Sequence, residues 1–235
     1  PARTDIVIDK FQDAGLYPDV KGVELNQHGG RVTSGFQLTL KGTGFSLFSP
    51  GKVFYALGGA DPRATGGDIA AEAVEYSGAI TLTESTIVKT RGRTNSGSWS
   101  AVSEVFFAVG TTPASSGNTV ISEIMYHPGA PTAEESAAQH LSSDDFEYVE
   151  LTNVSVETVN LSGSRFSNGI DLQFVAGPNA VLVPGASLVV VRDANAFAFR
   201  YGDETPVAAV YAGNLNNDGE TLRLVSEAGE TIQET

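Results

Sequence analysis

The chain has 235 residues, of which 41% are hydrophobic and 18% charged, and its formal net charge is −14. This length exceeds that of a usual single domain, and the apolar content suffices for sizeable cores, so two domains are expected. With 26 glycines, 10 prolines and many Thr, Val and Ser residues, the composition favours short strands and tight turns, hence an all-β protein. The chain contains no cysteine, which excludes disulfides and thiolate metal sites.

The charge is unevenly distributed along the sequence. Residues 1–116 contain 11 acidic and 10 basic residues, whereas residues 117–235 contain 17 acidic and 4 basic residues, a net charge of −13. A phosphate backbone is bound mainly through Lys and Arg, so no nucleic acid is expected as a partner. No apolar run is long enough for a membrane span, and residues 1–4 do not begin a signal peptide. Because the first residue is not Met, we interpret the chain as an excised fragment.

The first 27 residues are expected to form a short helix and a lead-in. Thr4 can cap a helix over residues 5–14, with Val7, Phe11 and Ala14 on one stripe and Gly15 as the stop. This pattern is typical of a linker helix that packs on a neighbouring element.

Residues 28–110 read as the first β-sandwich. A Gly-Gly pair at residues 29–30 marks a turn, and residues 36–41 alternate as one strand with Phe36, Leu38 and Leu40 facing inward. Further strands are expected at residues 53–57, 79–83, 85–91 and 98–107. Residues 111–117 are small and polar and are interpreted as a linker.

Residues 118–235 read as a second β-sandwich. Residues 120–126 and 148–151 are expected as strands, and alternation places Ile121, Glu123 and Met125 on one face. Residues 181–193 contain a Pro-Gly turn and then a strand so apolar that it must be covered on both sides. A polar insertion at 128–145 can form one or two helical turns within 133–141, and residues 195–201 suit a short helix with partly buried aromatics. The remaining strands are expected at 207–211, 221–225 and 229–233.

This order of elements in the second half resembles the lamin tail domain, an immunoglobulin-like β-sandwich. The segment Val159-Asn-Leu-Ser-Gly163 is similar to a motif of that family. The family usually follows this motif with a tryptophan, and here Phe166 is expected to take its place in the core. Family members continue with a further strand, so the resemblance implies a truncated C-terminus whose open sheet edge would invite pairing with another chain.

Residues 28–107 resemble the immunoglobulin-like module at the C-terminus of chitobiases and β-hexosaminidases. The shared residues are Tyr55, Asp61-Pro62-Arg63, Ile80-Thr81-Leu82 and Trp99-Ser100, whereas residues 58–60 depart from the family's Asp-Gly-Ser. Leu16-Tyr17-Pro18 and His28-Gly29-Gly30 are similar to a lead-in found after CotH-type kinase domains in bacterial multidomain proteins. The resemblance implies an upstream catalytic domain in the full-length chain.

The sequence gives little support for catalysis. It has no Gly-x-Ser-x-Gly motif, and its only candidate bases are His28, His127 and His140, for which solvated or turn roles are favoured. His127 and His140 could share zinc only if the insertion folded back, and zinc needs three or four ligands. We therefore predict no catalytic, cofactor-binding or metal-binding residues and no enzymatic activity.

Acidic residues are the densest polar group. Asp144, Asp145, Glu147 and Glu150 are interpreted as a solubilising cluster at the start of a strand, because a sandwich edge offers no cleft for paired carboxylates. Residues 214–219 imitate the start of a calcium loop, but the twelfth position is Val225 where a bidentate Glu is required. An Asp-Gly turn explains this segment without a metal.

Surface aromatics could stack on sugar rings, although packing roles are favoured for them. The candidates are Tyr17, Tyr76, Trp99, Tyr126 and Tyr211. Asn153 and Asn160 each begin a match to the glycosylation pattern, which arises often by chance.

The sequence therefore predicts two tandem immunoglobulin-like β-sandwiches with a short N-terminal helix. The favoured function is non-catalytic binding or scaffolding of protein or glycan surfaces, within a larger, exported protein of the cell envelope or extracellular space. The alternative is a carbohydrate-binding accessory module that serves an upstream catalytic domain.

Overall fold

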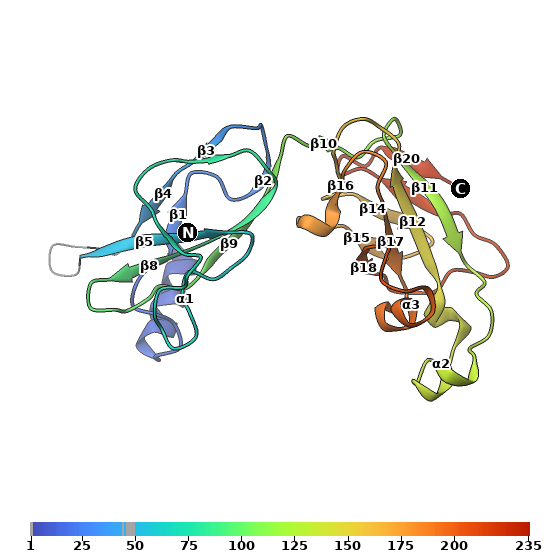
Figure 1. Ribbon diagram of the computed structural model, residues 1–235, viewed down its shortest axis with the longest axis horizontal. Coiled ribbons are helices and arrows are strands. Elements are labelled where there is room, and N and C mark those ends of the chain that lie inside the picture. Colours follow the sequence, from blue (N-terminus) through green and yellow to red (C-terminus); the bar gives the residue numbers. More distant parts are fainter. Residues whose placement is uncertain (1, 44, 46–49) are drawn as a thin grey trace. The chain divides into compact units, whose positions relative to one another are not determined.

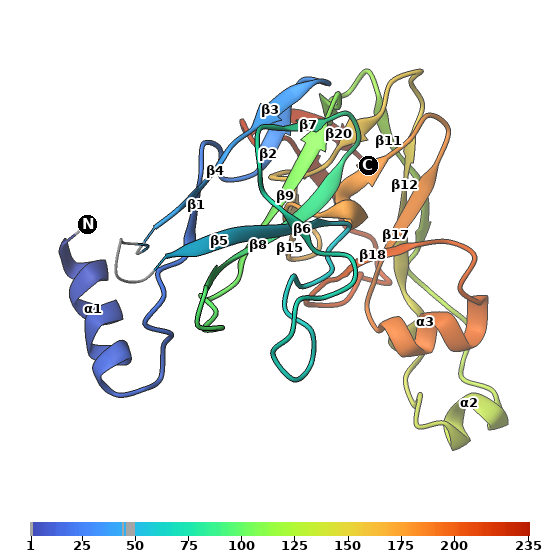
Figure 2. The same ribbon diagram turned by 60° about the vertical axis from the view of Figure 1, so that its left-hand side comes forward.

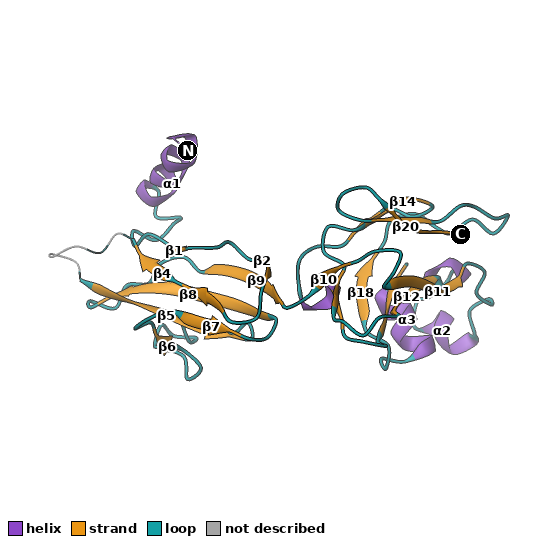
Figure 3. Ribbon diagram, turned by 90° about the horizontal axis from the view of Figure 1, so that it is seen from above, coloured by secondary structure: helices purple, strands orange, loops and turns teal. Residues whose placement is uncertain are grey.

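A computed structural model describes residues 2–43, 45 and 50–235 (Figure 1). Residue 1, the non-Met start noted in the sequence, lies outside the described residues. The chain divides into two compact units, unit 1 at residues 1–110 and unit 2 at residues 111–235. Both units consist of short strands, which confirms the all-β fold class (Figure 3).

Unit 1 begins with one helix and continues as strands. The helix is α1 (Ala2–Asp13). The strands are β1 (Val23–Leu25), β2 (Gly30–Val32), β3 (Phe36–Leu38), β4 (Leu40–Gly42), β5 (Gly51–Leu57), β6 (Val74–Glu75), β7 (Ile80–Leu82), β8 (Thr86–Thr94) and β9 (Ser103–Val109). The described residues form a sheet in the order β2-β9-β8-β5-β6 and two strand pairs, β1-β4 and β3-β7.

The core of unit 1 follows from alternation along its longest strands. In β8, Val88, Thr90, Gly92 and Thr94 are buried, so the residues between them face the opposite side of the sheet. Val88 joins Leu38, Leu82 and Phe107 in an apolar cluster between the large sheet and the two strand pairs. The opposite, outer face of β8 carries Lys89, Arg91 and Arg93.

Two expectations for unit 1 are corrected. Residues 36–41 do not form one strand, because β3 pairs with β7 whereas β4 pairs with β1, and the chain changes partner at Thr39. Leu38 and Leu40 are nevertheless buried, as the alternation predicts. Helix α1 begins before Thr4, so Thr4 lies inside it instead of capping it. Val7 and Phe11 are exposed by 44% and 48%, so this stripe is not covered by the described part of the chain.

Unit 2 is a sandwich of two four-stranded sheets with a smaller third sheet. Its strands are β10 (Thr112–Pro113), β11 (Thr119–Met125), β12 (Tyr148–Asn153), β13 (Val159–Asn160), β14 (Arg165–Asn168), β15 (Leu172–Gln173), β16 (Val181–Leu182), β17 (Ser187–Val191), β18 (Val207–Val210), β19 (Arg223–Val225) and β20 (Thr231–Glu234). The sheet orders within residues 111–235 are β11-β12-β17-β18, β15-β14-β19-β20 and β10-β13-β16.

Unit 2 also contains short helices. They are α2 (Ala133–Ala137), η1 (Ser143–Phe146), η2 (Pro178–Ala180) and α3 (Ala194–Tyr201). Helix α3 lies close to α2 and η1 (Figure 2). Strand β17 is covered on both sides, as its apolar sequence predicts: Leu188 and Val190 enter the main core, while Val189 and Val191 pack with Phe197 of α3.

Two expectations for unit 2 are also corrected. Strict alternation along β11 fails, because the pairing with β12 shifts between Ile121 and Glu123, and Ile121 and Ile124 both pack against the core. The segment 111–117, interpreted as a linker, contains strand β10, which pairs in parallel with β13. Asn118 holds the following turn because its side chain accepts the Ser115 N–H and donates to the Pro113 carbonyl.

Candidate functional site

The acidic group at the start of β12 is not the solvated cluster expected from the sequence. Asp145 belongs to a capping box with Ser142, and Glu150 accepts a hydrogen bond from the Ser122 hydroxyl. Glu147 is only 1% exposed, although it follows two acidic positions in the sequence. These carboxylates therefore support local structure.

Glu147 fastens a distant segment of unit 2 to β12. Its Oε2 accepts hydrogen bonds from the Tyr211 hydroxyl at 3.1 Å and from the Leu215 backbone N–H at 2.9 Å. Its Oε1 is buried and has no hydrogen-bond partner among the described residues. Burial raises the pKa of Glu147, although the two hydrogen bonds oppose this rise. Burial and the adjacent carboxylate raise the pKa of Tyr211 as well.

Residues 214–219 form a turn that this anchoring holds in place. The Gly219 N–H donates to the Asn216 carbonyl, and Gly219 has a φ of +95°, which favours glycine. The Asn216 side chain accepts the Asp218 N–H, while the Asn214 amide donates to Asp144. Of the side chains that resemble a calcium loop, Asn216 thus holds the turn, and the Asn214 oxygen accepts a hydrogen bond from Arg192.

The polar insertion is pinned to α3 by an ion pair that sequence reasoning missed. Arg200 donates from Nε and Nη2 to the two carboxylate oxygens of Glu135, each at 2.7 Å, and its guanidinium lies 3.3 Å from the centroid of the Phe146 ring. The hydrogen bond from Arg200 is the main cause that lowers the pKa of Glu135 to about 2. The only sequence signal was the Thr132–Glu135 spacing of a capping box, which is present.

The three histidines do not form a site. His28 and His127 are exposed, and His140 packs between the rings of Phe146 and Phe199. Within the described ranges, no group of three or more His, Cys, Asp or Glu residues is arranged to hold a metal ion.

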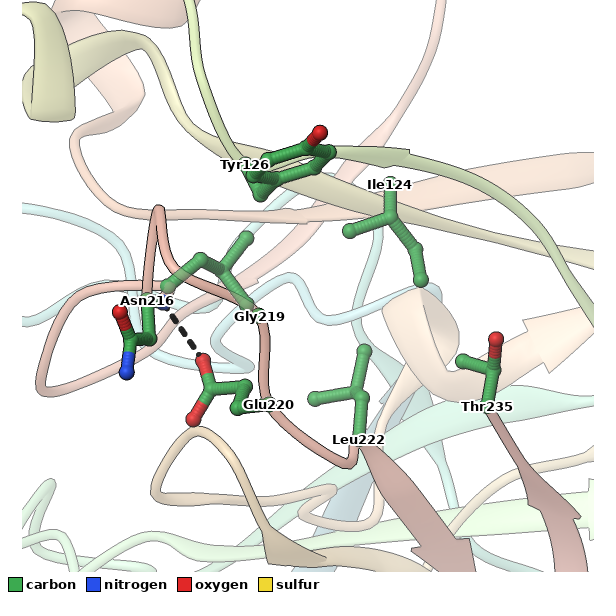
Figure 4. A pocket seen from close by; sticks show the side chains of 8 residues that line it. Ile124, Tyr126, Asn216, Gly219, Glu220, Leu222 and Thr235 are labelled. Atoms are coloured by element: carbon green, nitrogen blue, oxygen red, sulfur yellow. Dashed lines mark hydrogen bonds between the residues drawn. The ribbon is translucent and has the colours of Figure 1, made fainter.

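An apolar groove lies where the edges of the two large sheets of unit 2 come together. Strands β11 and β20 are joined by the Gln233 side chain, which accepts the Ile121 N–H at 2.6 Å. Beside this contact is a cavity of about 220 Å³ (Figure 4). Its lining residues are Ile124, Tyr126, Leu215, Asn216, Gly219, Glu220, Leu222 and Thr235.

The groove is apolar at its base and polar at one rim. Leu215 and Leu222 are buried beneath it, whereas Tyr126 is 49% exposed at its side. Glu220 holds the rim, because its carboxylate accepts the Asn216 N–H at 2.8 Å (Figure 4). Of these residues, sequence reasoning named Tyr126 as a surface aromatic and placed Asn216 and Gly219 in a turn. It did not bring them together, since they are distant from each other along the chain.

In unit 1, the residues of the Asp-Pro-Arg and Trp-Ser motifs come together on the outer face of β8. Arg91 pairs with both oxygens of Asp61, at 2.7 and 2.8 Å, and donates to the Ser100 carbonyl at 2.6 Å. The Trp99 indole N–H donates to the Gly67 carbonyl at 2.6 Å. These contacts fasten the loop between β5 and β6 to the sheet.

The other candidates have packing roles. Tyr76 packs against the core of unit 1, and Tyr211 is buried in unit 2, whereas Tyr17 is partly buried. Asn153 and Asn160 are buried by the fold, and the Asn153 amide donates to two backbone carbonyls, so neither asparagine is presented as an exposed glycosylation acceptor.

Comparison with known families identifies the second half of the chain. The lamin tail domain model matches residues 112–235, more than half of the sequence. The chain belongs to the lamin tail domain family. Phe166 is buried in the core of this domain, as the resemblance predicts. Comparisons with curated proteins and with solved structures returned no match.

The lamin tail domain has an immunoglobulin-like fold and is, in general, a non-catalytic binding module. Packing explains the family motif at residues 159–163. Val159 and Leu161 are fully buried, and Gly163 has a φ of +84°. A Cβ at Gly163 would lie 2.9 Å from the Glu227 side chain, so the position requires glycine. No helix in the described parts of either unit is long and apolar enough to cross a membrane.

Proposed function

We propose that this chain is a non-catalytic binding and scaffolding segment of a larger, exported bacterial protein. The observation that carries the proposal is the apolar groove of the lamin tail domain, in which Tyr126 is half exposed above buried Leu215 and Leu222. Such a groove can take an apolar side chain from a protein partner. The net charge of −13 on residues 117–235 favours a partner with basic residues beside that side chain.

The proposed context rests on the motif residues of unit 1. Their similarity to the chitobiase C-terminal module, and the similarity of the lead-in to that of CotH-type proteins, support a catalytic domain upstream of this chain and a location in the cell envelope or outside the cell. Unit 1 would then space that domain from its target, while the lamin tail domain engages a protein surface.

A display library of random peptides tests the groove. Immobilised chain is expected to enrich peptides that carry an apolar residue next to Lys or Arg, and Tyr126→Ser is expected to bind these peptides at least about tenfold more weakly. The matched control is Val156→Ser, because Val156 is 91% exposed and does not line the groove. Peptides that bind parent and Tyr126→Ser equally would contradict the proposed site.

A carbohydrate-binding accessory role is the second candidate, favoured by one observation in unit 1. Trp99 is only partly buried and lines a polar cavity of about 440 Å³ together with arginine and serine side chains. A glycan array of plant, fungal and bacterial polysaccharides tests this role with the complete chain. A flat response across the array would remove it.

A further inference from the structure

The polar cavity of unit 1 lies on the outer face of the central strand β8. It has a volume of about 440 Å³, within the range of small-ligand sites. The loop between β5 and β6 forms one wall with Arg63, Gly66 and Gly67, and the segment after β8 forms the other with Ser98 and Trp99. Arg91 lies between these walls.

Positive charge dominates this cavity. Asp61 compensates Arg91, whose side chain is only 15% exposed. Arg63 is exposed and forms no ion pair with another described residue. A guanidinium offers a planar pair of donors that matches a carboxylate, so Arg63 is available to an anionic group.

Arg93 adds a second charge next to the cavity. Its guanidinium carbon lies 5.3 Å from the centroid of the Trp99 ring, and its buried Nε has no hydrogen-bond partner among the described residues. Of the three acidic residues in the β5–β6 loop, Asp61 is paired with Arg91, and the exposed Asp68 and Glu72 do not line the cavity.

Trp99 is held rigidly at the cavity wall. Its indole N–H is bound to the Gly67 carbonyl, and its ring packs against Phe54 with centroids 5.7 Å apart. Gly66 and Gly67 both have a φ of +101°, and a Cβ at Gly66 would meet no atom within 4 Å, so the backbone there is open to a ligand. Ser98 is an exposed hydroxyl beside it.

We propose that this cavity binds an acidic sugar, a uronic acid residue of a polysaccharide, with its carboxylate on Arg63 and its ring beside Trp99. The inference rests on the carbohydrate-binding role above and names its ligand class. An acidic peptide fits less well, because β8 is paired on both edges, with β5 and β9, and offers no free strand edge to a peptide backbone. Residues 1–116 have 11 acidic and 10 basic residues, so unit 1 does not strongly repel an anion.

Calorimetric titration of the complete chain with oligomers of galacturonic acid tests the proposal. Parallel titrations use neutral cello-oligosaccharides and poly-glutamate. Arg63→Gln is expected to weaken galacturonate binding at least about tenfold without a change in melting temperature, since its side chain is exposed. Arg31→Gln, an exposed arginine on β2, is the matched control and is expected to bind like the parent.

The outcomes distinguish the acidic-sugar inference from the more general carbohydrate-binding role. Galacturonate binding that Arg63→Gln loses and Arg31→Gln keeps supports the proposal. Equal binding of poly-glutamate through Arg63 would assign the cavity to acidic peptides and overturn it. Binding of neutral sugars alone would overturn the acidic-sugar inference but leave the carbohydrate-binding role, whereas no binding of any glycan would remove both.

Discussion

The two units fasten long loops to their sheets with charged side chains in opposite ways. In unit 1, Arg91 meets an opposite charge on Asp61 at the partly exposed outer face of β8. In the lamin tail domain, Glu147 is buried, and its hydrogen bonds with other described residues come from the neutral donors Tyr211 and Leu215. The first arrangement keeps charge near solvent and leaves Arg63 available, while the second places a carboxylate where burial raises its pKa.

Substitutions in the two separate cores are expected to have the largest effects on stability. Leu38 of unit 1 and Leu151 of unit 2 are both fully buried, in different apolar clusters. Leu38→Ala and Leu151→Ala are each expected to lower the free energy of unfolding of their own unit by about 2–5 kcal/mol. Scanning calorimetry checks this result. A variant that shifts the transition of the other unit by the same amount would contradict two separate cores.

Breaking the partly exposed ion pair between Asp61 and Arg91 is expected to have a smaller effect on the stability of unit 1. Asp61→Asn removes the bidentate partner of Arg91 and is expected to cost unit 1 about 1–2 kcal/mol, reduced by the partial exposure of the pair. The control is Glu75→Gln, which breaks the more exposed pair with Lys52 and is expected to cost less than about 0.5 kcal/mol. If urea titrations showed equal losses of stability in Asp61→Asn and Glu75→Gln, the ion pair of Arg91 would not be what fastens the loop to the sheet.

The same pair gives unit 1 a defined pH dependence. The hydrogen bond from Arg91 is the main cause that lowers the pKa of Asp61. This contribution to stability is therefore fully present above the unfolded pKa, about 3.9, and is lost as the pH falls through the lowered value. The Asp61→Asn variant is expected not to show this loss of stability at acidic pH.

Glu147 gives the lamin tail domain a pH dependence of stability opposite in sign to that of unit 1. Because burial raises its pKa in the folded state, the folded domain holds this proton more tightly, and stability falls as the pH rises above the unfolded value of about 4.3. Glu147→Gln keeps an acceptor for Tyr211 and Leu215 but cannot ionise. Its melting temperature relative to the parent is expected to rise between acidic and neutral pH, and a constant difference would contradict the buried carboxylate.

Local patterns predicted most of the strands but not the contacts between distant segments. Alternation predicted that Leu38 and Leu40 are buried, because burial repeats along a strand, and the continuous apolar sequence of β17 predicted that both of its sides are covered. The alternation rule failed at the bulge in β11, where one additional residue changes which side of the sheet the following side chains face. The burial of Glu147 depends on partners 64 and 68 residues away, and periodicity carries no information about them.

The candidate sites were less predictable for the same reason. Tyr126 and Trp99 were named as surface aromatics, yet the residues that make each a cavity wall come from other elements. Trp99 is anchored by Gly67, 32 residues earlier, and the groove beside Tyr126 is completed by Leu215 and Leu222. Only folding brings these residues together.

Chemical-shift mapping tests most directly the claim that the two units bind different ligands. Trp99 is the sole tryptophan of the chain, so its indole N–H gives one assignable signal. On addition of galacturonate oligomers, we expect shifts of this signal and of amides at residues 63–67 and 97–100, with those of residues 111–235 unchanged. Shifts confined to residues 111–235, or an unshifted indole under saturating ligand, would contradict the account.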